Sequence, residues 1–575
     1  MRGADVIVKL LIKHGVEHIF GVPGDTSMAF HDALLKESDK IQHILCRDER
    51  HAAYAADAYA RVTGKIGVVE VPSGGGALYV VPGISEANLS NIPLLCIASE
   101  ISMDSDEMNA LTDCNQEDLF AAVSKWNTKI RLSSKIPQMV RKAIRMSTSG
   151  VTGATVLSVP ENLLRSEFDG EENDIYALDN TGILGKLKND ATDESALKVV
   201  DMIKESTRPI ILAGGGVHLS EAYEELGEFV KKYSIPVVSS IDGKGSISEL
   251  SEYVLGTVGA NGGSVEANDV MKEADLIIIL GSKLDNVTTM GLKIINREAK
   301  IVQVDISDAV LGNVLKVSYP VMCDIKMLLR KINKLEDNFD FNEKFELWIS
   351  YAKNKRLQKV NRIRKEYQRE SEYVIASRVF DVLDRITDED AIFVGDAGTP
   401  TPYISAYLLQ KKVGKNNIIP RAHGALGYAL GASLGAQVGR PTARVFSMFG
   451  DGSFGMAMGD LETAARLNLP IIFVNFQNEC FGWIKTIQRL YYKQDYFGVD
   501  FGCTDAVKIA EGMGLQGRHI TKNSEIEETF KWALEQNAPV LLNVIVEPPT
   551  DYVPPVYQWE VDVELSPEHR KKLVY

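Results

Sequence analysis

The sequence predicts an α/β protein built from three doubly wound domains, each with a parallel sheet enclosed by helices. Two observations support this prediction. Short apolar runs typical of buried strands alternate with helical patterns along nearly the whole chain, an order that favours parallel sheets. The chain is also 575 residues long, and single hydrophobic cores stop growing near about 250–300 residues, so several domains are expected.

Changes in composition divide the chain into three α/β units and three connecting or terminal segments. The strand-like runs lie at 66–71, 94–98 and 154–159 in the first unit, at 209–216, 235–238, 275–281 and 301–305 in the second, and at 445–449 and 471–476 in the third. The predicted segments are a first unit (1–165), a polar linker (166–194), a second unit (195–342), a charged, exposed connector (343–372), a third unit (373–549) and a C-terminal tail (550–575).

The composition excludes several classes of protein. The chain has 63 basic and 78 acidic residues and a net charge of −15, and such an acidic surface repels nucleic acid. No apolar run approaches the length needed to cross a membrane. The six cysteines show no CxxC spacing, which predicts buried thiols in a reducing cytoplasm. We therefore expect a cytoplasmic protein with neither nucleic acid nor membrane as partner.

The most informative stretch joins two strand-like runs in the third unit. The run 445–449 ends just before Asp451, and the run 471–476 ends just before Asn478, with a helical pattern between them. Two parallel strands joined by a helix bring these side chains together at the carboxyl edge of the sheet, where open α/β sheets bind ligands. A carboxylate and an amide oxygen suit Mg²⁺, which keeps water and substrate phosphate as further ligands.

The turn around the aspartate is Gly450-Asp451-Gly452, and Ser453 follows it at the start of the predicted helix. Free N–H groups at a helix start favour an anion. The turn alone is compatible with an ordinary strand-to-helix connection, but the distant Asn478 favours a site for a metal-bound diphosphate.

This stretch resembles the thiamin diphosphate motif, in which GDG is followed after about two dozen residues by an Asn pair. Here 24 residues separate GDG from Gln477-Asn478, and Gln477 replaces the first Asn. Four further segments resemble the acetolactate synthase and 2-oxo acid decarboxylase group of thiamin diphosphate enzymes in the right order. They are FGVPGD (20–25), the helical pattern CRDERHAAYAADAYAR (46–61), PSGGG (72–76) and NIPLL (91–95). The resemblance covers nearly the whole chain.

The resemblance implies roles for individual residues. Glu49 aligns with the glutamate that activates the aminopyrimidine of the cofactor, although an exposed helical Glu is the plainer alternative. Leu426 aligns with the residue that holds the cofactor bent, and the backbone of Gly398 and Thr399 with the loop that binds the diphosphate. The full cofactor set is Gly398, Thr399, Leu426, Gly450, Asp451, Gly452, Ser453, Asn478, Phe481 and Gly482, with Mg²⁺ held by Asp451, Asn478 and the backbone carbonyl of Cys480.

For the residues expected near the substrate, the sequence resembles two different branches of the family. Gln116 in TDCNQE matches an acetolactate synthase pattern, whereas Asp25 after GVPG matches the decarboxylases. His423 is a further candidate acid or base. We expect decarboxylation of a 2-oxo acid with transfer of the acyl anion to an acceptor, as in acetolactate synthase. The alternatives are a decarboxylase that releases an aldehyde and a pyruvate oxidase-like flavoenzyme.

The second unit contains a segment that indicates whether the protein binds FAD. Its segment 281–287 resembles an element of FAD-containing acetolactate synthases, but Lys283 and Val287 replace both arginines of that element. These two replacements disfavour FAD as a cofactor. The Gly-rich turn 214–216 lacks the full GxGxxG pattern of an NAD-dependent dehydrogenase, which is one alternative class. The other is a non-catalytic homologue, which the intact Glu49 and Asp451 disfavour. The resemblance also implies a homodimer or homotetramer with active sites between subunits, and the tail is expected to wrap over the active site or a neighbouring subunit.

Overall fold

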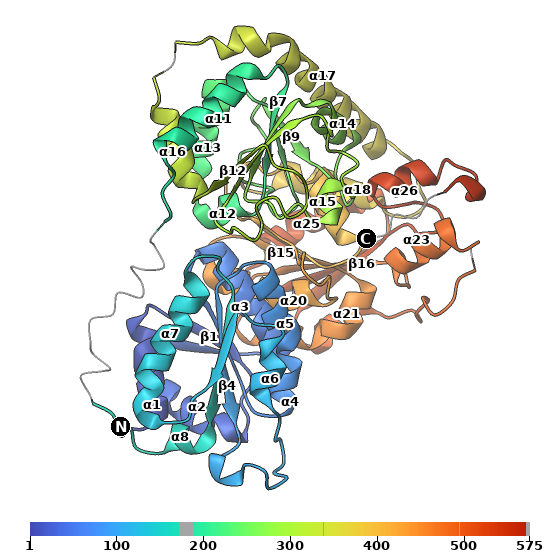
Figure 1. Cartoon of the computed structure of the whole chain (residues 1–575). Helices are drawn as coiled ribbons and strands as arrows, with labels where there is room; N and C mark the ends of the chain where they lie inside the picture. The colour runs from blue at the N-terminus through green and yellow to red at the C-terminus, as the bar shows by residue number, and fades with distance from the viewer. Residues whose placement is uncertain (172–187, 337, 494, 571–575) are drawn as a thin grey trace.

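The computed structural model of the chain describes residues 1–171, 188–336, 338–493 and 495–570. It contains three domains, each with a six-stranded parallel sheet flanked by helices, which confirms the predicted fold class. In Figure 1 the N-terminal domain (blue) lies at the bottom, the central domain (green) at the top, and the C-terminal domain (orange) beside both. Residues 172–187, in the middle of the predicted linker, lie outside the described residues.

The N-terminal domain has the strand order β2-β1-β3-β4-β6-β5. Its strands are β1 (His18–Gly21), β2 (Gln42–Leu45), β3 (Gly67–Val71), β4 (Leu94–Glu100), β5 (Trp126–Lys129) and β6 (Ala154–Pro160). Its helices are α1 (Gly3–Lys13), α2 (Met28–Lys36), α3 (Glu49–Thr63), α4 (Gly75–Tyr79), α5 (Val81–Leu89), α6 (Gln116–Ala121), α7 (Ile136–Thr148) and α8 (Glu161–Arg165). Every residue of β3, β4 and β6 is buried, as expected for strands covered on both faces.

The central domain has the strand order β12-β11-β10-β7-β8-β9. Its strands are β7 (Pro209–Ala213), β8 (Val237–Ser239), β9 (Val254–Thr257), β10 (Leu276–Leu280), β11 (Lys300–Asp305) and β12 (Tyr319–Met322). Its helices are α11 (Asp193–Glu205), α12 (Gly216–Ser220), α13 (Tyr223–Tyr233), α14 (Val265–Glu273), α15 (Asn286–Thr289) and α16 (Ile325–Lys334).

The charged stretch predicted as an exposed connector is the long helix α17 (Phe341–Tyr367). One face of its first half is buried: Phe345 and Trp348 are shielded from solvent, and the indole N–H of Trp348 donates to the carbonyl of Pro209 at 2.8 Å. The prediction was wrong for this face, because four apolar residues at helical spacing, among many charges, are enough to pack it against the central domain.

The C-terminal domain has the strand order β14-β13-β15-β16-β18-β17. Its strands are β13 (Ile392–Gly395), β14 (Asn417–Ile418), β15 (Val445–Gly450), β16 (Ile472–Gln477), β17 (Gln516–Ile520) and β18 (Val540–Ile545). Its helices are α18 (Ala376–Ile386), α19 (Pro400–Tyr407), α20 (Tyr428–Gly439), α21 (Asp451–Ala457), α22 (Leu461–Arg466), α23 (Gly482–Tyr491), α24 (Ala506–Gly512) and α25 (Ile526–Glu535), and α26 (Tyr557–Asp562) lies in the tail.

The tail packs against α23. The rings of Trp559 and Trp483 lie 4.4 Å apart between centroids, and the hydroxyl of Tyr491 donates to Asp562 at 2.6 Å. The tail therefore covers part of the C-terminal domain of its own chain.

Helices α3 and α20 join the N-terminal and C-terminal domains. Their small residues allow close approach: a Cβ on Gly435 would lie 1.8 Å from the carbonyl oxygen of Ala55. A buried polar group crosses the same boundary, since Asp57 accepts a hydrogen bond from Tyr428 and pairs with Arg61 at 2.8 Å. The two domains are thus held together by tight packing around a satisfied buried ion pair.

Two findings bear on the predicted location. Among the described residues, no helix combines the length and the apolar character needed to span a bilayer. All six cysteines are free thiols. The prediction that they are buried is wrong for Cys503, which is exposed, and for Cys114, which is half-buried.

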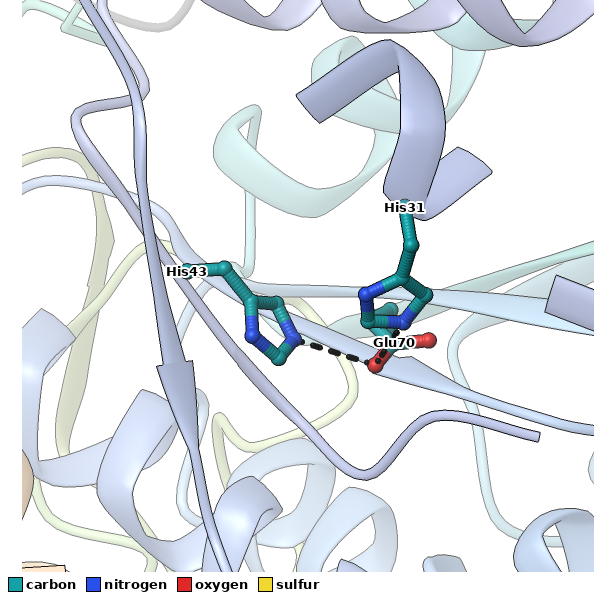
Figure 2. Close-up of side chains that lie close together, drawn as sticks. All are labelled: His31, His43 and Glu70. Atoms are coloured by element: carbon teal, nitrogen blue, oxygen red, sulfur yellow. Dashed lines mark hydrogen bonds and ion pairs between the residues drawn. The ribbon is translucent and has the colours of Figure 1, made fainter. Parts of the chain in front are cut away.

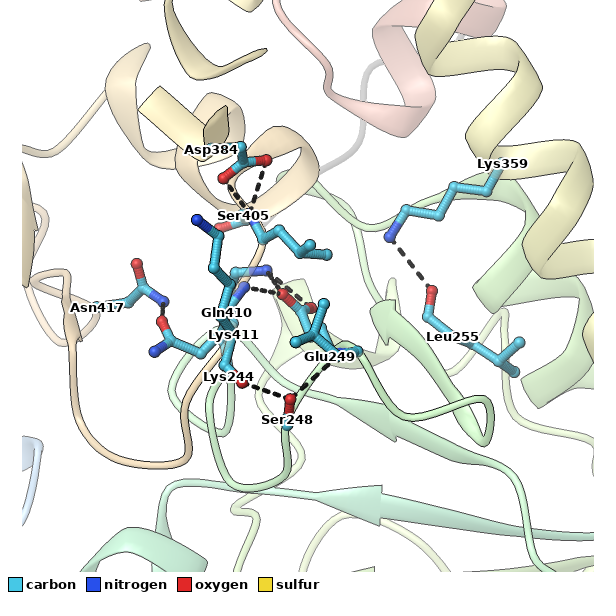
Figure 3. Close-up of polar contacts among 12 residues, drawn as sticks. Lys244, Ser248, Glu249, Leu255, Lys359, Asp384, Ser405, Gln410, Lys411 and Asn417 are labelled. Carbon is cyan, nitrogen blue, oxygen red and sulfur yellow. Dashed lines mark hydrogen bonds and ion pairs between the residues drawn. The ribbon is translucent and has the colours of Figure 1, made fainter. Parts of the chain in front are cut away.

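A buried ion pair links the central domain to the C-terminal domain (Figure 3). The ammonium of Lys244 lies 2.8 and 2.6 Å from the two carboxylate oxygens of Glu249, and both side chains are buried. The backbone N–H of Gln410 donates to the same carboxylate at 2.7 Å. Glu249 therefore connects two domains through one buried charge.

We expect Lys244→Met to lower the free energy of unfolding by about 3–5 kcal/mol, because it leaves the buried charge of Glu249 unpaired. The measurement is the midpoint and slope of urea denaturation. The double variant Lys244→Met/Glu249→Gln removes both charges, keeps an acceptor for Gln410, and should recover most of the loss. Lys300→Met is the matched control, since Lys300 and Glu205 are each 55% exposed and such pairs contribute less than about 1 kcal/mol. Equal losses in both single variants would contradict the expectation.

Candidate active site

Three loops converge at the carboxyl edge of the C-terminal sheet, namely those that follow β13, β15 and β16. Strand β15 lies between β13 and β16, and its last residue, Gly450, pairs with Phe476. Asp451 thus follows one strand and Asn478 the next. The structure places them side by side, as the sequence predicts: the backbone N–H of Asn478 donates to Oδ2 of Asp451 at 3.1 Å.

The carboxylate of Asp451 is held rigidly at this edge. Oδ2 also accepts from the backbone N–H of Glu479 at 2.5 Å, and Glu479 adopts a left-handed conformation with φ of 59°. Burial raises the pKa of Asp451 to about 6. Oδ1 of Asn478 accepts a weak S–H bond from Cys480 at 3.3 Å. A carboxylate and a side-chain amide on neighbouring loops therefore border one partly buried site, and their oxygens are the ligand types that a hard cation requires.

Asp396 organises the loops around this edge, although sequence analysis did not select it. It is fully buried at the end of β13, and its Oδ1 accepts from the backbone N–H of Gly427 at 3.1 Å and from the hydroxyl of Ser453 at 2.8 Å. Its Oδ2 accepts from the N–H of Ala429 at 2.9 Å. One carboxylate thus fixes the segment before α20 and the start of α21. A GDA sequence after a strand was the available signal.

A cavity of about 600 Å³ opens above these loops. Every residue that the resemblance assigned to the cofactor or its metal lines it, and so does one candidate acid or base. The predicted residues on its wall are Gly398, Thr399, His423, Leu426, Gly450, Asp451, Gly452, Ser453, Asn478, Cys480, Phe481 and Gly482.

The remaining wall is mostly apolar, with some aromatic residues, and includes the cation of Arg421. Phe476, Trp483 and Tyr403 contribute apolar surface, and Arg421 contributes a positive charge. Within the described residues, the nearest carboxylate oxygen to the guanidinium of Arg421 is that of Asp285, at 3.9 Å. This long contact leaves Arg421 able to attract an anionic ligand in the cavity.

His423 lines the cavity but also bonds to the N-terminal domain. Its Nε2 lies 2.6 Å from the hydroxyl of Ser85, and its backbone N–H donates to Glu86 at 3.0 Å. Glu86 also accepts from the backbone of Arg421 at 3.0 Å. The N-terminal domain therefore positions the loop that carries both His423 and Arg421.

Glu49, the predicted activating acid, lies outside this cavity. It begins α3, where Asp48 caps the helix by accepting from the N–H of Arg50 at 2.8 Å. Its carboxylate is half-buried, faces the loop of Gly76, and forms no ion pair within the described residues. Burial raises the pKa of Glu49. The structure of one chain does not bring Glu49 and Asp451 together.

The other two predicted substrate residues also lie outside the cavity. Asp25 is exposed at the start of a short helical turn. Gln116 is fully buried: its amide N–H donates to the carbonyl of Ser99 at 2.8 Å, and its carbonyl accepts from the hydroxyl of Ser158 at 3.0 Å. The amide of Gln116 therefore stabilises its own domain and is not presented to a ligand. The TDCNQE pattern did not reveal that both polar atoms are satisfied internally.

The segment that resembles a flavin-binding element lies at the boundary with the N-terminal domain. The ammonium of Lys283 donates to the carbonyl of Leu89 at 2.6 Å and to the side chain of Asn91 at 3.2 Å. Lys283 thus stabilises a domain contact, and Val287 lines the cavity.

Comparison with protein families identifies the three domains. Residues 1–119 match the thiamine pyrophosphate enzyme N-terminal TPP binding domain, residues 197–332 the thiamine pyrophosphate enzyme central domain, and residues 396–544 the C-terminal TPP binding domain. The chain therefore belongs to the thiamine pyrophosphate enzymes.

Curated relatives define the branch of the family. The chain is 30% identical to a probable acetolactate synthase large subunit of Methanococcus aeolicus, over 99% of this chain and 96% of the relative. It is 31% identical to that of Methanocaldococcus jannaschii, over 95% and 92%. It is 28% identical to the acetolactate synthase isozyme 3 large subunit of Escherichia coli, over 95% and 95%. The protein is thus a thiamine pyrophosphate-dependent, acetolactate synthase-like enzyme.

Proposed function

We propose that this enzyme uses thiamin diphosphate and Mg²⁺ to decarboxylate a 2-oxo acid and to transfer the resulting acyl anion to a second 2-oxo acid. The observation that carries the cofactor part is the placement of Asp451, Asn478 and the Gly398 loop around one cavity. The observation that carries the transfer is the full-length similarity to acetolactate synthase large subunits.

The residues present fit the cofactor and its metal. Asp451 and Asn478 would supply two oxygens to Mg²⁺, with the backbone carbonyl of Cys480 as a third, and Mg²⁺ takes its other ligands from phosphate and water. Gly398 has a positive φ of 86°, and no heavy atom lies within 4 Å of where its Cβ would be. A bound anion can therefore approach the backbone N–H groups of this turn closely.

Bound thiamin diphosphate supplies a carbon nucleophile, and the protein must bind, bend and activate it. We assign Leu426 to the apolar contact that holds the bent form. We assign Glu49 to the hydrogen bond that places a proton on the aminopyrimidine, a task that suits a carboxyl whose pKa burial has raised. Phe476, Trp483 and Tyr403 on the cavity wall would limit access of water to the reacting carbon, and Arg421 would attract the carboxylate of the acceptor.

Product analysis tests the reaction. Pyruvate incubated with the purified enzyme, thiamin diphosphate and Mg²⁺ should yield acetolactate as the main product, with little free acetaldehyde. Other 2-oxo acids, each alone and with an added aldehyde, define the donor and acceptor. Acetaldehyde as sole product, with its release abolished in Asp25→Asn, would favour the decarboxylase instead. The same sample should lack a stoichiometric flavin absorbance, because Lys283 and Val287 replace both arginines of the flavin-binding element.

The separation of Glu49 from the cavity also leads us to propose at least a homodimer. Near Glu49, helix α4 exposes Leu78 (51%) and Tyr79 (59%), and such an apolar surface is typical of an interface. A two-fold symmetric dimer would bring Glu49 of each chain to the cavity of the other. A homotetramer would combine two such pairs.

Mixing two inactive variants tests this arrangement. Glu49→Gln and Asp451→Ala chains, unfolded and refolded together in equal amounts, should recover about one quarter of the wild-type activity. Half of the dimers are mixed, and each mixed dimer has one site with both native residues, if the two residues come from different chains. If they act within one chain, no mixed dimer has a complete site and activity stays at the level of the separate variants. Wild-type chains refolded in parallel provide the control for recovery.

A further inference from the structure

A second group of possible metal ligands lies in the N-terminal domain, on elements that the proposed reaction does not use. His31 extends from α2, His43 from β2 and Glu70 from β3, and Figure 2 shows both imidazoles directed at the carboxylate between them. Nε2 of each histidine lies 3.1 Å from Oε1 of Glu70. The three ligand atoms all lie within 4.8 Å of one another.

The backbone of the sheet brings these residues together. Strand β1 lies between β2 and β3, with Ile19 paired to His43 and Gly21 paired to Glu70. Glu70 must therefore extend its carboxylate across β1 to reach His43. Gly21 permits this crossing, because a Cβ there would lie 2.3 Å from Oε1 of Glu70.

The group holds a buried negative charge that has no permanently positive partner. Glu70 is 1% exposed, and its only ion-pair partners within the described residues are His31 and His43, whose charge depends on protonation. The second carboxylate oxygen, Oε2, is buried and has no hydrogen-bond partner. A buried carboxylate without a fixed cation is unfavourable. A divalent ion would neutralise it while using the two imidazoles in their neutral form.

We propose that His31, His43 and Glu70 bind one divalent transition metal ion, with Zn²⁺ as the best match. Two imidazoles and one carboxylate form a ligand set that Zn²⁺ uses in tetrahedral sites, where a fourth position is left for water. Mg²⁺ and Ca²⁺ prefer oxygen ligands and are disfavoured here. Ligands about 2.0–2.1 Å from a tetrahedral ion lie roughly 3.3–3.4 Å apart. The two His–Glu separations of 3.1 Å therefore need to grow by a few tenths of an ångström, and the two histidine nitrogens, which lie within 4.8 Å of each other, must come to the same separation.

The site is open to solvent, and a metal ion bound there would link several elements of the N-terminal domain. Both histidine side chains are 17% exposed, so solvent reaches the ligands. The bound ion would tie α2 to β2 and β3, beside the loop that leads to Glu49. It would differ from the proposed Mg²⁺ site in its domain, its ligands and its preferred ion.

The test is a zinc titration of the metal-free full-length enzyme in competition with a chromophoric chelator. We expect one tight Zn²⁺ per chain, which millimolar Mg²⁺ does not displace. His31→Asn, His43→Asn and Glu70→Gln should each weaken the affinity by at least about tenfold. His18→Asn is the matched control: His18 lies on β1 with its ring beside Tyr59, outside the cluster, and this variant should bind zinc as the wild type does. Asp451→Asn should likewise keep the tight zinc site.

Three readouts use the wild-type enzyme and so do not depend on whether a variant folds well. Co²⁺ added to the wild-type enzyme should give the visible bands of a four-coordinate ion, and X-ray absorption of the zinc form should show two imidazole ligands. Zinc should also raise the thermal midpoint of the wild type, because it binds the folded state. Absence of a stoichiometric tight site in the wild type would overturn the proposal. So would a tight site whose affinity and Co²⁺ bands are unchanged in folded Glu70→Gln.

Discussion

The Glu49→Gln variant should fold normally and lose about 10²–10⁴-fold in kcat, the range that a positioned acid or base contributes. Glutamine has the size of glutamate but cannot share a proton with a ring nitrogen. Glu49 starts α3, and its helix cap is Asp48, so the substitution leaves the cap intact. The carboxylate has no ion pair within the described residues, and the carbonyl of Gln can still accept from the backbone N–H of residue 49. The loss should therefore appear in activity and not in stability.

Steady-state kinetics with saturating thiamin diphosphate and Mg²⁺ measures this effect, and urea denaturation checks the fold. Glu37→Gln is the matched control, because Glu37 follows α2 and pairs with exposed Lys40. It should retain wild-type kcat. A decrease of less than tenfold in Glu49→Gln would remove Glu49 from the role of activating acid.

The second large effect is expected at Asp451. Asp451→Ala should weaken the binding of thiamin diphosphate in the presence of Mg²⁺ by more than about 100-fold. Outer partners of metal ligands already contribute about 10–100-fold, and Asp451 is proposed as a direct ligand. Alanine also deprives the backbone N–H groups of Asn478 and Glu479 of their acceptor. The variant therefore loses both the metal ligand and the shape of the loop.

Asp451→Asn separates these two contributions. The amide keeps a carbonyl acceptor for the loop but removes the negative charge, so a large loss in this variant identifies the metal as the cause. Cofactor binding is measured by the fluorescence of Trp483, which lines the cavity. Asp500→Asn is the control, because Asp500 is 57% exposed beside Lys485. Full activity of the wild type after exhaustive chelation and dialysis would contradict a metal requirement.

The same carboxylate predicts a pH dependence. Burial raises the pKa of Asp451 to about 6, and a metal ligand must lose its proton before it binds. The affinity for Mg²⁺ and thiamin diphosphate should therefore be nearly constant above pH 7 and decrease as the pH is lowered through about 6. In Asp451→Asn this decrease should be absent.

Much of the C-terminal site could be predicted from local sequence because parallel strands place consecutive strand ends at one edge. The segment between Asp451 and Asn478 holds little more than the short helices α21 and α22 and strand β16, so neighbouring strand ends bring the two residues together. Asp396 was missed for the opposite reason. Its partners, Gly427 and Ser453, lie 31 and 57 residues away, and no local pattern connects them.

Gln116 shows what a sequence pattern leaves open. It occurs in a TDCNQE segment, and that context predicted a residue near the substrate. The structure instead satisfies its amide with Ser99 and Ser158 inside the N-terminal domain. A sequence pattern specifies which residue is present, whereas burial and hydrogen-bond partners decide what it can contact.

The sequence by itself determined the three α/β domains, the Asp451–Asn478 edge and the family, because apolar periodicity and short spacings act over neighbouring strands. Only the tertiary structure decided which side chains from distant segments share a site. His31, His43 and Glu70 meet because β2 and β3 both pair with β1, and because Gly21 leaves room for a carboxylate to cross that strand. Glu49 lies outside the cavity of its own chain, although α3 packs on α20 of the C-terminal domain. Both outcomes depend on long-range packing, which no stretch of local sequence encodes alone.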